Sequence, residues 1–468
     1  MNLIDPYARL MDLVAGLEAK QFLAVDIVSF YLDRIRRSQT RLNAFTVVDA
    51  QGAMTAAAQS DRRRASGTEL SVLDGIPIVI KDMFDSAGEV CGCGAPAWAG
   101  RIAAADSSVV ARLKRAGLCV LGRTQMVELA FGAWGLNPAL GTPWNPWDLS
   151  VHRIPGGSSS GSAVAVAAGL APVAIGSDTG GSVRAPAALN GVTGFKASHG
   201  LVDLTGALAL SERLDSVGVL SRTVEDAAQV LSLLSDSDLG VASLQPSNAS
   251  GVREKPLLGM QIVALDEQAF GKSVDEEIIL ALRQSRRILE GLGASLKLQS
   301  LPFDLRQVVD ACGAMIAADG WLHHQSAMSS TPGLPATEAV ARRLSSGRSV
   351  DETQYRQLLD FQRTITQTWV EWLGPAQAVL MPTVPLLACP VAAVDESSLA
   401  MGLFNRLGNF VGGCSVSLPA GLASTGLPMG VQLLAPRKHD AVLVQVGAAF
   451  QRACEFHRQS PDLAAIGL

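Results

Sequence analysis

The sequence predicts a single α/β domain built around a mixed β-sheet. With 468 residues, of which 48% are hydrophobic and 17% charged, the chain can bury a large core. From about residue 73 onward, short apolar runs alternate with segments of helical spacing, which is the pattern of an α/β fold. No internal repeat or low-complexity tract divides the chain. We therefore expect a helical N-terminal layer over residues 1–65 and an α/β core over residues 66–468 of the same domain.

The N-terminal 65 residues are expected to be helical. Residues 22–35 carry apolar side chains at helical spacing, and Arg34, Arg36 and Arg37 gather near the end, where positive charge suits the helix dipole. This pattern predicts a helix with one buried face.

Strands and helices are then expected to alternate through the core. Apolar runs predict strands at residues 75–80, 119–121, 172–175, 260–264, 378–381 and 429–434. Helical spacing predicts helices at residues 109–116, 162–169, 223–234, 273–291 and 440–456. Ser273 with Glu276 resembles a capping box at the start of one of these helices. Residues 235–255, rich in Ser, Asp, Gly and Asn, are expected to be a surface linker.

Charge and hydropathy exclude several classes of protein. The formal net charge of −5 gives no reason to expect nucleic acid or an anionic membrane as a partner. The first residues lack the basic and then apolar layout of a secretory signal. The longest uncharged run, residues 154–177, is too rich in Gly, Ser and Pro for a membrane span. A cytoplasmic protein is the expectation.

Neither the cysteines nor the histidines indicate a cofactor. Seven cysteines, an odd number scattered over a long chain, favour reduced thiols over a disulfide framework. Cys91 and Cys93 are separated by one residue, which is too tight for a zinc or redox pair. None of the six histidines has metal-ligand spacing, and His199 is the one nearest the glycine-rich region. We expect no metal and no cofactor.

Lys81 and Ser182 are the first candidates for chemistry. Lys81 ends the apolar run of residues 75–80. If it is buried, desolvation lowers its pKa and yields a neutral amine that can accept a proton; if it is exposed, it is an ordinary surface lysine. Ser182 follows Gly180 and Gly181, which allow a tight turn whose amides, from about Thr179 to Ser182, can converge on an oxyanion beside the serine hydroxyl.

A second serine cluster, Gly-Gly-Ser-Ser-Ser-Gly-Ser at residues 156–162, includes Ser158, which lies 24 residues upstream of Ser182. Ser158 could relay a proton between Ser182 and Lys81, because a hydroxyl both donates and accepts hydrogen bonds, but spacing alone does not establish that geometry. A phosphate-binding loop is disfavoured, since no lysine stands directly before the serine. A dinucleotide-binding loop is disfavoured too, because Arg184 and Pro186 interrupt the expected long helix.

These segments closely resemble the amidase signature family. The similarity is strongest over residues 155–196 and includes Asp-Thr-Gly-Gly-Ser-Val-Arg-Ala-Pro-Ala at 178–187; it also takes in residues 75–82, 122–128, 214–226 and 418–432. Residues 235–400 resemble the family least. Ser160 stands where the family usually has glycine. The resemblance implies a single domain with a twisted mixed central sheet that helices cover on both faces.

The resemblance also implies a mechanism. Lys81, Ser158 and Ser182 fall on the family's Ser-cisSer-Lys triad, with Ser182 as acyl nucleophile and Ser158 as proton relay to a neutral Lys81. The amides of Thr179, Gly180, Gly181 and Ser182 match its oxyanion hole. Hydrolysis of a small or medium amide to an acid and ammonia or an amine would proceed through an acyl-enzyme. We expect Arg184 to pair with Asp178 rather than with a substrate carboxylate.

Substrate and assembly stay open at this stage. One alternative is a glutaminase-type subunit of a tRNA-dependent amidotransferase, and another is action on carbamates, ureas, hydrazides or esters. Phe131 and Trp134 are candidate walls of the substrate pocket, as are Trp321 and residues 404–410, although aromatic side chains also fill cores. The expected partner is a small amide, with neither nucleic acid nor membrane, and a homodimer is an open alternative to a monomer.

Overall fold

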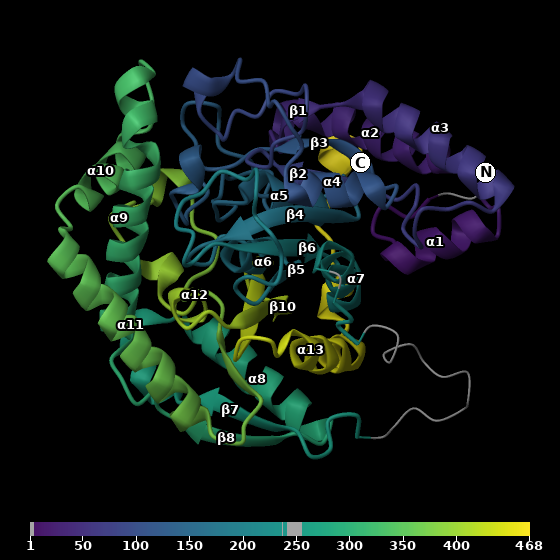
Figure 1. Ribbon diagram of the computed structural model, residues 1–468. Coiled ribbons are helices and arrows are strands. Elements are labelled where there is room, and N and C mark those ends of the chain that lie inside the picture. Colours follow the sequence, from purple (N-terminus) through teal and green to yellow (C-terminus); the bar gives the residue numbers. More distant parts are fainter. Residues whose placement is uncertain (1–3, 236, 241–254) are drawn as a thin grey trace.

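The computed structural model describes residues 4–235, 237–240 and 255–468, and within them the strands form one sheet (Figure 1). Its strands are β1 (Phe45–Val48), β2 (Pro77–Lys81), β3 (Cys119–Thr124), β4 (Val173–Asp178), β5 (Thr193–Lys196), β6 (Ser216–Ser221), β7 (Gln261–Leu265), β8 (Ser295–Gln299), β9 (Ala378–Pro382), β10 (Cys414–Leu422) and β11 (Pro428–Ala435). The spatial order is β1-β3-β2-β4-β6-β5-β10-β11-β9-β7-β8. The sheet is mixed, since β2 runs parallel to β3 and β4 whereas β5, β6, β10 and β11 have antiparallel neighbours.

Helices cover both faces of this sheet. They are α1 (Leu10–Glu18), α2 (Ala24–Leu42), α3 (Ala50–Ser66), α4 (Ser108–Arg115), α5 (Ser160–Ala167), α6 (Arg184–Asn190), α7 (Val224–Ser235), α8 (Glu276–Gly291), α9 (Leu305–Ser330), α10 (Glu338–Gly347), α11 (Glu352–Leu373), α12 (Arg406–Phe410) and α13 (Asp440–Cys454). The α/β fold with one mixed sheet, predicted from the sequence, is confirmed.

The helices fall into groups that pack together. α5 and α6 contact each other and the central strands, whereas α13 contacts α7 and α8, and these three helices contact strands β5, β6 and β9–β11. α9, α10 and α11 gather at one side of the molecule, and α1–α3 lie at the opposite side (Figure 1). Within the residues described, no helix is both long and apolar enough to cross a membrane.

The buried centre of the sheet explains why its strands could be recognised in the sequence. Every residue of β2, β4, β6, β9 and β11 is buried, so each strand is a short, mostly apolar run between turns. The predicted strands and helices of the core all exist, with ends that shift by a few residues. Thr223 caps α7, because its hydroxyl accepts the Asp226 amide at 3.1 Å.

Two local predictions are wrong. The N-terminal layer is not entirely helical, because residues 45–48 form β1, an edge strand that pairs antiparallel with β3. Ser273 does not cap α8: it ends a short 3₁₀ helix (Glu267–Ser273), and Asp275 is the N-cap residue. The predicted linker at 235–255 lies almost entirely outside the described residues.

Helix α5 comes close to the strand ends that carry the site. An added Cβ at Gly161 would lie 2.2 Å from the Ala44 carbonyl oxygen and 2.6 Å from the Gln125 amide nitrogen. The Gly161 amide in turn donates to the Gln125 carbonyl at 2.9 Å. Only glycine allows this approach, which fixes the segment that contains Ser158.

We predict that Gly161→Ala lowers the free energy of unfolding by about 3 kcal/mol, because the new methyl group collides with backbone that cannot rotate away. Gly291→Ala is the matched control. It adds the same group at the end of α8, where no atom lies within 4 Å, and should be neutral or slightly stabilising. Denaturant unfolding of both variants measures the difference, and equal effects would contradict the packing argument.

Candidate active site

Lys81 is completely buried at the carboxyl end of β2. Its Nζ lies 2.8 Å from Ser158 Oγ and 2.8 Å from Ser177 Oγ. Burial lowers the pKa of Lys81 to about 7, against which the charges of Asp178 and Asp215 act to raise it. Near neutral pH a large fraction of this amine is therefore unprotonated and able to accept a proton.

The sheet explains why these groups meet. β2 and β4 are adjacent and parallel, so their carboxyl ends lie at the same edge, where open α/β sheets place functional side chains. Lys81 ends β2, and Ser177 and Asp178 end β4. Ser177 was not a candidate from the sequence alone. The pairing of β2 with β4 places it beside Lys81, and a prediction of that pairing would have identified it.

Ser158 belongs to the loop before α5. The Gly157–Ser158 peptide bond is cis, as the family resemblance implies. The Gly157 amide donates to the Ala133 carbonyl at 2.8 Å, and the Val127 amide donates to the Ser158 carbonyl at 3.2 Å. These bonds hold the loop against the segment around residue 130, with the Ser158 hydroxyl turned toward Lys81.

Ser182 lies in the turn between β4 and α6 and is 8% exposed. Its carbonyl accepts the amide of Ser159 at 3.1 Å, which ties the two serine loops together one residue away from Ser158. Together, the strand edge and these two loops bring Lys81, Ser158 and Ser182 into one region.

A buried ion pair organises the Ser182 turn. Arg184 donates to both carboxylate oxygens of Asp178, at 3.0 and 2.8 Å, and both side chains are fully buried. The predicted pairing is confirmed. Arg184 also donates to Gln432 (3.1 Å) and Asn409 (2.7 Å), and its charge holds the pKa of Asp178 well below the usual range. The carboxylate is thus available at every physiological pH to accept amides of the turn.

One of the four backbone amides predicted for the oxyanion hole, that of Gly181, already donates a hydrogen bond within the protein. The Gly181 amide donates to Asp178 Oδ1 at 2.8 Å, so it is satisfied within the turn and the prediction for this residue is corrected. Gly181 has a φ of +119°, and an added Cβ would lie 2.6 Å from Asn405. Among the residues described, the amides of Thr179, Gly180 and Ser182 have no protein acceptor.

A chain of hydrogen bonds links the turn to the outer helices. The Thr179 hydroxyl donates to Asp215, whose other oxygen accepts the Ser211 amide at 3.0 Å. The Ser211 hydroxyl donates to Asp319 on α9, and Asp319 accepts the Tyr355 hydroxyl of α11 at 2.6 Å. Burial raises the pKa of Asp215 to about 6. Two helices that are distant in the sequence therefore help to hold the turn.

Ser182 opens onto a cavity of about 70 Å³. Its lining residues are Ala130, Phe131, Gly132, Ala133, Trp134, Thr179, Gly180, Ser182, Leu210, Ile316, Arg343, Glu396, Ser398, Leu399, Met401, Gly402 and Arg406. Phe131 and Trp134, which the sequence analysis singled out, both line it. Arg343 and Glu396 form an ion pair at 2.9 Å beside it.

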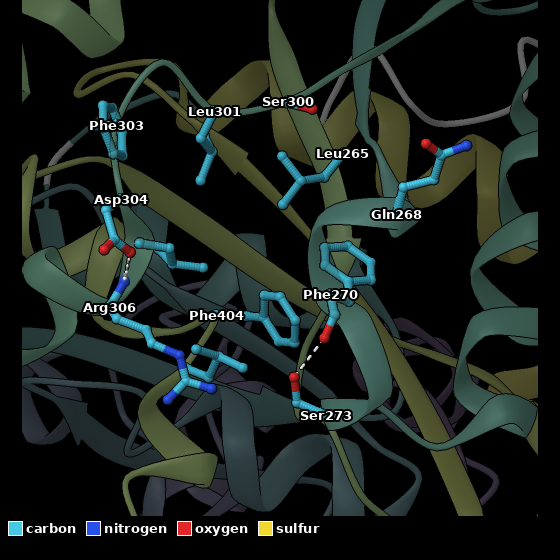
Figure 2. Close-up of a pocket in the computed structure, with 12 residues that line it drawn as sticks. Leu265, Gln268, Phe270, Ser273, Ser300, Leu301, Phe303, Asp304, Arg306 and Phe404 are labelled. Carbon is cyan, nitrogen blue, oxygen red and sulfur yellow. Dashed lines mark hydrogen bonds between the residues drawn. The ribbon is translucent and has the colours of Figure 1, made fainter.

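A larger cavity, of about 410 Å³, lies elsewhere and contains none of the three candidate catalytic residues (Figure 2). Phe404 lines this second cavity, where its ring meets that of Phe270 edge to face at 5.1 Å (Figure 2). Phe404 is therefore not a wall of the Ser182 cavity, and neither is Trp321.

The remaining polar candidates contact other groups. His199 Nε2 is 2.9 Å from the Glu212 carbonyl oxygen, and burial lowers the pKa of His199. The sulfur atoms of Cys91 and Cys93 are 3.9 Å apart, and both thiols are free. In the described part of the chain, no group of three or more His, Cys, Asp and Glu side chains is arranged to hold a metal ion.

Comparison with known proteins identifies the family of this chain. Residues 26–444 match the family described as Amidase. Among curated relatives, a glutamyl-tRNA(Gln) amidotransferase subunit of Chromohalobacter salexigens is 33% identical over 97% of this chain and 98% of its own. The corresponding protein of Aromatoleum aromaticum is 34% identical over 98% of this chain and 99% of its own.

Solved structures with a similar fold indicate the same family. A protein described as an amidase superposes with a TM-score of 0.85 at 27% identity, over 95% of this chain and 99% of its own. The peptide amidase of Stenotrophomonas maltophilia superposes with a TM-score of 0.80 at 26% identity, over 95% of this chain and 96% of its own. The chain belongs to the amidase signature family. It is an enzyme that acts on amide C–N bonds.

We predict that kcat/KM rises with pH and is half-maximal near pH 7, because the neutral form of Lys81 predominates only above its lowered pKa. Below pH 6 the rate should fall about tenfold per pH unit. Lys81→Arg, which cannot lose its proton, should be inactive throughout. His199→Gln is the control and should keep the wild-type pH profile. A wild-type kcat/KM that does not change between pH 5 and pH 9 would contradict the role of Lys81.

We also predict that Arg184→Met lowers the free energy of unfolding by about 3–5 kcal/mol, since it leaves the Asp178 carboxylate buried without its cation. The exposed pair Arg363–Asp360 offers a control, because Arg363→Met should change stability by less than about 0.5 kcal/mol. Chemical denaturation at pH 7 measures both. A small loss for Arg184→Met would mean that Asp178 is held by the turn amides alone.

Proposed function

We propose that this enzyme hydrolyses a small or medium carboxylic amide to an acid and ammonia or an amine, with Lys81, Ser158 and Ser182 as its catalytic triad. The observation that carries the proposal is the 2.8 Å contact between Ser158 Oγ and a fully buried Lys81 whose pKa is lowered to about 7. A buried amine of that pKa, bonded to a serine, is a suitable general base.

In the acylation step, Ser182 Oγ attacks the substrate carbonyl carbon and loses its proton to Ser158 Oγ. Ser158 passes its own proton to Lys81 Nζ at the same time, so the relay serine stays neutral. Ser177 supports this arrangement, because its hydroxyl makes a second 2.8 Å contact with Lys81 and fixes the direction of the amine. The carbonyl oxygen becomes an oxyanion.

The amides of Thr179, Gly180 and Ser182 stabilise that oxyanion in this proposal. Gly181 contributes differently: its bond to Asp178 holds the turn so that its neighbours point outward. Donors that are fixed before the reaction need no reorganisation when the charge develops, and a single one is commonly worth a factor of about 10²–10³ in rate.

Collapse of the tetrahedral intermediate breaks the C–N bond. The proton on Lys81 returns through Ser158 to the leaving nitrogen, which departs as ammonia or an amine. Water then attacks the acyl-enzyme with the same relay acting as base, and Ser182 recovers its proton when the acid leaves. Atoms and charge balance without a cofactor.

The Ser182 cavity supports a substrate of limited size. Its volume of about 70 Å³ leaves room for a short acyl group, with Phe131 and Trp134 as apolar walls. Carbamates, ureas, hydrazides and esters present the same carbonyl geometry and remain alternatives for the same machinery.

A second candidate function is that of a glutaminase-type subunit in a tRNA-dependent amidotransferase. The relatives that are subunits of glutamyl-tRNA(Gln) amidotransferase, at 33–34% identity over nearly the whole of both chains, favour it. In that case the small-molecule amide would be glutamine, and partner chains would be required.

The cellular setting is proposed from the same features. The seven cysteines are free, which fits a reducing compartment such as the cytoplasm. We propose a small amide as the substrate and no direct contact with nucleic acid or membrane. A homodimer is one assembly to test, by light scattering of the purified chain.

We predict that Ser182→Ala lowers amide turnover by at least about 10⁴-fold while the protein stays folded, because the acyl acceptor is lost. Ser160→Ala is the matched control: it removes a buried serine whose hydroxyl only reaches the Gln125 carbonyl, at 3.4 Å, and should retain activity. Ammonia or amine release is measured on aliphatic, aromatic and carbamate substrates, an ester and glutamine, with the chain alone. Full activity of Ser182→Ala would overturn the mechanism, and turnover of glutamine only with partner chains would favour the second candidate.

A further inference from the structure

Arg406 lines the Ser182 cavity and takes no part in the catalytic steps proposed above. We propose that it forms a subsite for an anionic group of the substrate, so that the preferred substrates are amides that also carry a carboxylate. The proposal rests on the proposed amidase function and names the class of its substrate.

The Arg406 side chain occupies a slot made by glycines. An added Cβ would lie 2.6 Å from its Nη1 at Gly313, 2.9 Å from its Nε at Gly402 and 3.8 Å from its Nε at Gly180. The three glycines come from α9, from the segment before α12 and from the turn that contains Ser182. Side chains at Gly313 or Gly402 would displace the guanidinium, so the slot fits an arginine that extends toward the nucleophile.

The charge of Arg406 is not balanced by an acidic group. Among the residues described, it makes no ion pair within 4.0 Å, and its hydrogen bond to protein is that from Nη1 to the Val309 carbonyl at 2.7 Å. The charge of Asp310 acts on it only from farther away, and burial lowers the pKa of Arg406. Arg406 is only partly buried and lines the cavity, and a guanidinium has five N–H donors, so most of its donors remain for a ligand.

The other arginines near the site are satisfied. Arg184 is paired with Asp178 at 2.8 Å, and Arg343 with Glu396 at 2.9 Å. Because Arg343 and Glu396 cancel, the charged side chains that line the cavity leave an excess of one positive charge, that of Arg406. The cavity therefore favours an anion.

A carboxylate is the group that matches this subsite best. The planar guanidinium can donate two parallel hydrogen bonds to it, a geometry that lysine cannot provide. Since Arg406 adjoins Gly180, two residues before Ser182, an anchored carboxylate would hold the amide carbonyl near the nucleophile and restrict its orientation. A short monoamide of a dicarboxylic acid, or glutamine, has this layout. The alternative is that Arg406 only joins α12 to α9 through the Val309 carbonyl.

Binding without turnover separates these possibilities. In the Ser182→Ala background, calorimetry is used to compare succinamate with its methyl ester, which has nearly the same shape and no charge. We expect succinamate to bind at least about tenfold more tightly than the ester, as charge-assisted hydrogen bonds imply. Adding Arg406→Met should abolish that preference, and Arg406→Lys should retain part of it. Arg342→Met removes an exposed arginine of α10 and should leave the preference unchanged.

Several results would overturn the subsite. One is an unchanged preference in Arg406→Met, and another is an equal loss of affinity for both probes with a lowered Tm, which would indicate the structural role. The absence of any preference for succinamate or glutaramate over its uncharged methyl ester would also overturn it. Because no turnover is measured, a failure of the acyl-enzyme mechanism would leave this binding result intact and would be recognised separately in the Ser182→Ala kinetics.

Discussion

The burial of Lys81 away from water governs the rest of the site. An ammonium group is strongly hydrated, and its complete burial at the end of β2 favours the neutral amine. The fold accepts that cost because two serine hydroxyls, Ser158 and Ser177, supply hydrogen bonds in place of water. The nearby charges of Asp178 and Asp215 limit the shift, so the pKa of Lys81 settles near neutrality rather than far below it.

The buried ion pair of Asp178 and Arg184 gives the turn that contains Ser182 its shape. Arg184 helps to keep Asp178 ionised in the core, and the carboxylate accepts the amides of Gly181 and Val183, at 2.8 and 3.1 Å. The same carboxylate therefore acts on two properties of the site: its charge acts on Lys81, and its oxygens set the direction of the backbone beside Ser182. Because Asp178 accepts the amide of Gly181, that amide points toward the carboxylate and is not among the donors of the proposed oxyanion hole.

Helices α9 and α10 supply residues that line or support the proposed substrate cavity. α9 supplies Asp319 to the hydrogen-bond chain behind Thr179 and Gly313 to the slot of Arg406. α10 supplies Arg343 to the cavity wall. These helices belong to the region of the sequence that resembles the family least, whereas Lys81, Ser158 and Ser182 come from segments that resemble it closely.

The amino-acid sequence was sufficient to establish the sheet-and-helix architecture and the candidate catalytic residues. Buried strands such as β2, β4 and β11 can be recognised because they are short, mostly apolar runs, and the glycine-flanked serines stand out because few other structures need that spacing. The family resemblance then connected Ser158 with Ser182, which local spacing could not do. Edge strand β1 was missed because it is only four residues long and lies between two long helices, α2 and α3, whose spacing dominates this part of the sequence.

How these residues act together became visible only in the folded chain. That Lys81 is buried, that Ser177 contacts it and that the Gly181 amide turns toward Asp178 all depend on which strands are neighbours and how the turn is held. The placement of Arg406 depends on three glycines that are far apart in the sequence, from Gly180 to Gly402. Sequence patterns report local conformation and burial, whereas desolvation, pairing and charge balance arise between segments that only folding brings together.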